Sequence, residues 1–233
     1  MPEFETIRNI ARQVLTAPSP SGTGDNWLWD RTLRILRNIE AICRLPELAR
    51  QATTIDRSCL ITAAYFSESG AVQGAAAQPG WILSNQADTN TDLSNLSVKI
   101  ASKKLDGVIS ESRIEKVAKI IQESSDRFTR MTEAMILSDA RNLEDMGMVG
   151  LLHEFRRNVI QGKGISDLLE SWKCKIEYGY WQARIKESFR FKVVCRIAQQ
   201  RLTAAGALMD QLAAENNLTD LKKILMHSLE KAR

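Results

Sequence analysis

Three short stretches of the sequence carry the charged side chains that could do chemistry. They read WDRTLRILRN at 29–38, AAYFSESG at 63–70 and SDARNLEDMG at 138–147. Two carboxylates, Glu68 and Asp139, are of the kind that hold Mg²⁺ or Mn²⁺, because hard cations prefer oxygen ligands. Two guanidiniums, Arg31 and Arg34, can pair with carboxylates or bind anions through a planar fork of N–H donors. These residue types therefore indicate either a metal site or an anion site.

In this order, the three stretches resemble the motifs of the HD-domain superfamily, which are helical metal-dependent phosphohydrolases. That family begins with a pattern like W-x-H-x-x-R-V, continues with A-A-L-x-H-D-x-G at the end of a helix, and closes with D-A-D-x-L-x-x-x-G. The resemblance extends over roughly 25–160 and rests on fold-level analogy. It implies a His…His-Asp…Asp set that holds one or two divalent metals, which lower the pKa of a bound water and polarise a phosphate.

Most metal ligands of that family are replaced in this chain. Matched by position, the first histidine falls on Arg31, and the motif's arginine falls on Arg34. The His-Asp pair falls on Ser67 and Glu68, and the last aspartate falls on Asp139, the one ligand that is kept. Arg31 cannot ligate a metal, because a guanidinium stays protonated. We therefore expect a vestigial site without a metal, in which Arg31 pairs with Asp139, Glu68 or both.

Two functions stay open on these residues. In the first, the chain is a degenerate, catalytically inactive HD-domain protein without a cofactor, and it serves as a ligand-binding or protein-interaction module. Arg31 and Arg34 would then bind an anionic small molecule such as a nucleotide. In the second, the chain is an active phosphohydrolase that uses Mn²⁺ or Mg²⁺ on a nucleotide or another phosphoester. The candidates for its rebuilt site are Glu68, Asp139, Asp30 and His153. A cation in the metal position favours the first function.

Composition excludes several classes of protein. The 233 residues carry a net charge of +4, an excess too small to indicate a nucleic-acid partner. No apolar run is long enough to span a membrane, and the N-terminus lacks the apolar segment of a secretory signal. The four cysteines form no CxxC pair, so we expect reduced thiols in a cytoplasmic protein. Whether the protein is a homodimer stays open at this point.

Apolar residues recur with helical spacing along most of the chain, which predicts an all-α fold. We expect a single HD-like helical bundle over 1–233, with the motif core at about 25–160 and a long helical extension at about 165–233. Segments 17–26, 71–91 and 161–164 are rich in residues typical of loops. Because 71–91 is long for a loop in a compact domain, it is a candidate cover for a pocket.

The extension is expected to run helically from 168 toward 208, with Gly179 and Gly206 as candidate breaks. Its aromatic and basic tract at 172–184 has the composition of a nucleic-acid stacking surface. Because Trp172, Ile176 and Tyr180 fall on one helical face, a core or dimer stripe is the better explanation.

Overall fold

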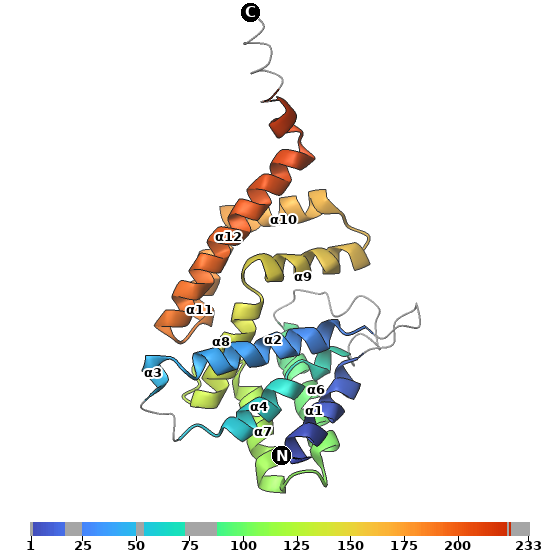
Figure 1. The fold of residues 1–233 in the computed structure, drawn as a ribbon, viewed down its shortest axis with the longest axis vertical. Coiled ribbons are helices and arrows are strands. Elements are labelled where there is room, and N and C mark those ends of the chain that lie inside the picture. Colours follow the sequence, from blue (N-terminus) through green and yellow to red (C-terminus); the bar gives the residue numbers. More distant parts are fainter. Residues whose placement is uncertain (1, 17–24, 50–53, 73–87, 223, 225–233) are drawn as a thin grey trace, which may run out of the picture. The chain divides into compact units, whose positions relative to one another are not determined.

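The computed structural model describes residues 2–16, 25–49, 54–72, 88–222 and 224, and every regular element in these ranges is a helix. The all-α prediction is therefore confirmed (Figure 1). The chain divides into two compact units, residues 1–144 with 188–194, and residues 145–187 with 195–233. Since the division follows Glu144, the boundary expected between the motif core and the extension lies inside the second unit.

The first unit contains the first two motif segments and residues 138–144 of the third. Its helices are α1 (Pro2–Leu15), α2 (Trp27–Ile42), α3 (Pro46–Ala49), α4 (Arg57–Phe66), α6 (Asp88–Leu105), α7 (Glu111–Glu123) and α8 (Thr132–Glu144). The middle motif lies at the end of α4, and the other two lie on α2 and α8.

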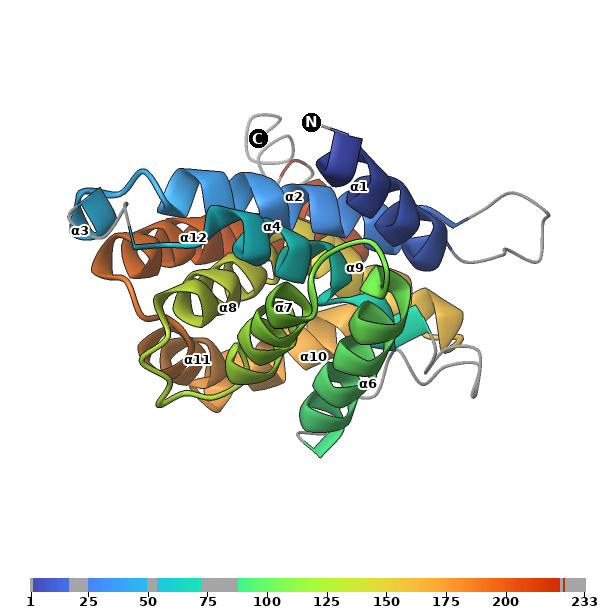
Figure 2. The ribbon, with the colours of Figure 1, turned by 90° about the horizontal axis from the view of Figure 1, so that it is seen from below.

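Helix α4 is the centre of the first unit. It packs against α1, α2, α6, α7 and α8, and Figure 2 shows it between α2 and α7. Nearly all of its residues from Cys59 to Phe66 are buried, as in a helix surrounded by others. Its start is fixed by Asp56, whose Oδ1 accepts the N–H of Cys59 at 3.0 Å. Ser67 and Glu68, which follow the end of α4, therefore lie in the interior of the unit.

The second unit is formed by α9 (Gly147–Ile160), α10 (Ile165–Glu177), α11 (Tyr180–Ser188) and α12 (Lys192–Asn216). Buried Glu154 of α9 accepts from Ser171 at 2.9 Å and pairs with Lys175, both on α10. The rings of Trp172 and Trp181 join α10 to α11, with centroids 5.4 Å apart. None of the helices that the structure describes is both long and apolar enough to cross a membrane.

The predicted loops agree with the structure in part. Residues 161–164 do connect α9 to α10. Residues 17–24 and 73–87 lie outside the described ranges, and so does the suggested role of 71–91 as a cover. The prediction of a loop over 71–91 is wrong at both ends, because 69–72 are helical and α6 begins at Asp88.

Candidate functional site

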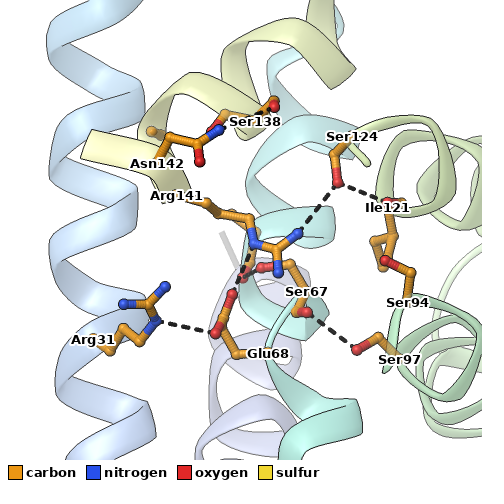
Figure 3. A network of polar contacts seen from close by, with 12 residues as sticks. Arg31, Ser67, Glu68, Ser94, Ser97, Ile121, Ser124, Ser138, Arg141 and Asn142 are labelled. Carbon is orange, nitrogen blue, oxygen red and sulfur yellow. Dashed lines mark hydrogen bonds and ion pairs between the residues drawn. The ribbon is translucent and has the colours of Figure 1, made fainter. Parts of the chain in front are cut away.

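Arg31 points into the first unit from α2. The buried apolar residues Trp29, Ile35 and Ile39 hold this helix against its neighbours, and Arg31 itself is only 8% exposed. Its Nε donates to Oε2 of Glu68 at 3.0 Å (Figure 3). Of the pairings expected for Arg31, the one with Glu68 is therefore present.

Glu68 is held in place by the backbone just after α4. Ser97 of α6 donates from its Oγ to the carbonyl of Ser67 at 3.1 Å and accepts the N–H of Gly70 at 2.9 Å. Gly70 is required by close packing, since a Cβ there would lie 2.2 Å from the carbonyl oxygen of Leu93. These contacts fix residues 67–70 against α6.

Arg141 of α8 belongs to the same cluster, and sequence reasoning missed it. Its Nε donates to Oε1 of Glu68 at 2.8 Å, and its Nη1 lies 3.4 Å from Oγ of Ser124. Figure 3 shows its guanidinium between Glu68 and Ser124. The sequence did mark this residue, because Arg141 stands at the position of the second aspartate in the D-A-D pattern. Each oxygen of Glu68 thus accepts from a different arginine.

Asp139 is held by backbone groups instead. The side chain is fully buried and accepts the N–H of Arg190 at 2.9 and 3.1 Å and the N–H of Phe191 at 3.0 Å. Burial raises the pKa of Asp139 to about 6, although the N–H groups of Phe191 and Arg190 act to lower it. Among the hydrogen bonds and ion pairs of Asp139 in the described structure, none involves Arg31. Of the alternatives expected for Arg31, the pairing with Asp139 is therefore absent from the described structure.

The other predicted site residues have other partners or belong to other parts of the fold. Arg34 forms an ion pair with buried Glu144, and Oγ of Ser67 donates to the carbonyl of Ala64 at 3.1 Å. Asp30 is exposed on α2. His153 belongs to α9 of the second unit.

The residues at the motif positions do not fit a divalent metal. Glu68, the carboxylate in the His-Asp position, has an arginine at each oxygen, and the first histidine position holds Arg31. Within the described ranges, no three or more side chains of His, Cys, Asp and Glu gather closely enough to hold a metal ion. The expectation that the protein has no cofactor stays a prediction.

Comparison with known proteins identifies a similar fold but no family. No model of a known protein family matches the sequence, and no curated protein matches it. The crystal structure of YpgQ from Bacillus subtilis is similar, with a TM-score of 0.56 over 92% of this chain and 96% of that chain. The two sequences are 18% identical, so the likeness shows the fold alone.

Proposed function

We propose that this protein is a degenerate member of the HD-domain superfamily that no longer hydrolyses phosphoesters and acts as a ligand-binding or protein-interaction module. One observation carries the proposal, namely that Arg31 and Arg141 occupy both oxygens of Glu68. The two guanidiniums offset the negative charge of Glu68, and their positive charge disfavours a metal cation beside it.

Charge supports this proposal. Two arginines stand where the family pattern has a histidine and an aspartate, so positive side chains take the place of a metal and of one of its neighbours. Buried ionised groups require compensation by opposite charge, and the two guanidiniums supply it for Glu68. Asp139, the kept ligand, is engaged by the N–H groups of Arg190 and Phe191. The ligand of the module would be an anionic small molecule such as a nucleotide. A homodimer and a cytoplasmic location remain predictions.

Restoring the motif tests the proposal. The matched variant carries Arg31→His, Ser67→His, Glu68→Asp and Arg141→Asp in the full chain. Metal content is measured by mass spectrometry after dialysis against Mn²⁺ and against Mg²⁺, and hydrolysis is measured with a panel of nucleotides and phosphoesters. We expect no stoichiometric metal and no hydrolysis for the natural chain, and about one metal per chain for the restored variant if it folds, because histidine and carboxylate ligands suit these ions.

The natural chain decides the question even if the restored variant does not fold. Stoichiometric Mn²⁺ or Mg²⁺ together with phosphoester hydrolysis by the natural chain would overturn the proposal and favour the active phosphohydrolase.

A further inference from the structure

Helix α12 carries its charges in the order that its own dipole disfavours. Its first part, 192–201, contains three basic side chains and no acidic one, and the rest, 202–216, contains two acidic side chains and no basic one. A helix dipole favours acids in the first turn and bases in the last, as in α1. Glu47 supplies a carboxylate at the start of α12, where it accepts the N–H of Val193. The charges further along α12 have no such explanation.

Two of these charges lie on one exposed face of α12. The helix buries a different face, which contains Ala198, Ala205 and Met209. The exposed face contains Arg196, Gln199, Thr203, Ala207 and Asp210. Neighbouring members of this set are three or four residues apart, so they form a single stripe along the helix. The stripe has a base at one end, an acid at the other and small side chains between them.

Neither charge of the stripe is used within the chain. In the part of the protein that the structure describes, Arg196 and Asp210 have no ion pair and no side-chain hydrogen bond. Another arginine of the second unit differs in this respect, because Arg184 pairs with Asp145 at 2.9 Å. Arg196 and Asp210 are therefore both available to a partner.

We propose that α12 pairs with α12 of a second copy of this chain, in antiparallel orientation about a two-fold axis at Thr203. Arg196 and Asp210 each lie seven residues from Thr203, in opposite directions. A two-fold axis at Thr203 places Arg196 of each copy opposite Asp210 of the other, so the dimer gains two ion pairs. The small side chains of Thr203 and Ala207 allow the two helix axes to approach closely between these pairs.

Charge selects both the orientation and the partner. In a parallel pair of α12 helices, Arg196 would face Arg196 of the other copy, and like charges repel. A partner of one sign would match only one end of the stripe. A second copy in antiparallel orientation presents both charges in the reverse order and so matches both ends.

This inference goes beyond the proposed function and does not depend on it. It concerns the second unit, whereas the proposed function concerns the cluster around Glu68 in the first unit. A chain that stays monomeric loses the dimer but keeps the proposed function. A chain that binds metal and hydrolyses phosphoesters loses the proposed function, whether or not it forms a dimer.

Sedimentation equilibrium of the full chain over a range of protein concentrations tests the proposal. We expect a monomer–dimer equilibrium that weakens with added salt, because exposed ion pairs are screened. Arg196→Glu and Asp210→Lys each place like charges opposite one another and should raise the dissociation constant about tenfold or more. The variant with both substitutions restores opposite charges, and its dissociation constant should return to within about threefold of the natural value.

Two matched controls separate this contact from a general effect of net charge. Lys186→Glu and Glu170→Lys reverse exposed charges of the second unit on other helices, and each changes the net charge by the same amount as the corresponding α12 variant. Both are expected to leave the dissociation constant unchanged. Circular dichroism checks that every variant is folded. If a charge reversal on α12 does not fold, Thr203→Glu replaces it, because it sets two carboxylates against each other at the axis and must weaken the dimer.

Four results would overturn the proposal. The first is a natural chain that stays monomeric up to about 1 mM. The second is a dimer that folded Arg196→Glu and Asp210→Lys leave unchanged, since it would use another surface. The third is an equal weakening by the controls. The fourth is a double variant that associates no better than the single ones, because the two residues would then not face each other.

Discussion

Glu68 and Asp139 are both buried carboxylates at motif positions, but their surroundings differ in kind. Glu68 faces two full positive charges, from Arg31 on α2 and Arg141 on α8. Asp139 faces the partial charges of two backbone N–H groups, with the charged side chains of Arg190 and Glu47 as further neighbours. A guanidinium stays protonated at any accessible pH, whereas N–H dipoles offset only part of the cost of burying a carboxylate. Glu68 is thus held by full positive charges, and Asp139 by partial ones.

The largest effect is expected from removing the shared carboxylate. Glu68→Ala leaves the buried guanidinium of Arg31 beside Arg141 without its acceptor, so the free energy of unfolding should fall by about 3–5 kcal/mol. Urea unfolding followed by circular dichroism at pH 7 measures the loss. Glu177→Ala is the control, because its ion pair with Lys173 has side chains 57% and 75% exposed and should contribute about 1 kcal/mol or less. Equal losses in the two variants would contradict the view that Glu68 compensates the buried positive charge of Arg31.

A smaller, pH-dependent effect is expected at Asp139. Burial raises its pKa from 3.8 to about 6, so the folded chain binds this proton more tightly than the unfolded chain. The stability that this proton contributes is complete below pH 4 and is lost as the pH rises through 6. Asp139→Asn cannot titrate, so its unfolding free energy relative to the natural chain should rise by about 2–3 kcal/mol between pH 4 and pH 7. Urea midpoints across this range provide the measurement, and parallel curves would show that Asp139 does not titrate as described.

The smallest effect is expected where the backbone next to Glu68 is fixed. Ser97→Ala removes the hydroxyl that joins the carbonyl of Ser67 to the N–H of Gly70, and should lower the unfolding free energy by about 1–2 kcal/mol. Ser112→Ala, at an exposed position, should change it by less than about 0.5 kcal/mol. The same urea titrations compare the two, and indistinguishable values would mean that Ser97 does not hold this segment.

Helical periodicity was enough to predict the all-α fold, and motif order was enough to predict that Arg31 pairs with Asp139, Glu68 or both, of which the pair with Glu68 is present. Both follow from local information, since spacing places Arg31 on a buried helix and burial demands a partner of opposite charge. The D-A-D pattern marked the position of Arg141, but its contact with Glu68 could not be predicted, because position on α8 does not reveal which side chain from another helix it meets. The partners of Asp139 are backbone N–H groups, which leave no trace in residue type.

The second unit shows a similar limit. Gly179 does break the helical run, with φ at +65°, but Gly206 lies inside α12, so that predicted break is wrong. A further break at residues 189–191 had no glycine or proline to mark it. Of the stripe expected through Trp172 and Ile176, Trp172 is buried and Ile176 is 45% exposed, so the part that was to lie in a core holds for Trp172 alone, and a dimer stripe stays a prediction. Gly179 separates Tyr180 from that helix, so the common face does not extend to it.

The hydrogen bonds that Arg190 and Phe191 donate to Asp139 bear on how the protein is synthesised. All helices of the first unit have left the ribosome once Glu144 has, but the N–H donors of Asp139 come from Arg190 and Phe191. At ordinary rates of translation, the chain between them takes on the order of 2–10 s to appear. During that interval Asp139, which is fully buried in the folded unit, lacks its native N–H donors. The first unit is synthesised first, but its native hydrogen bonds are complete only after residues 190 and 191 have been added.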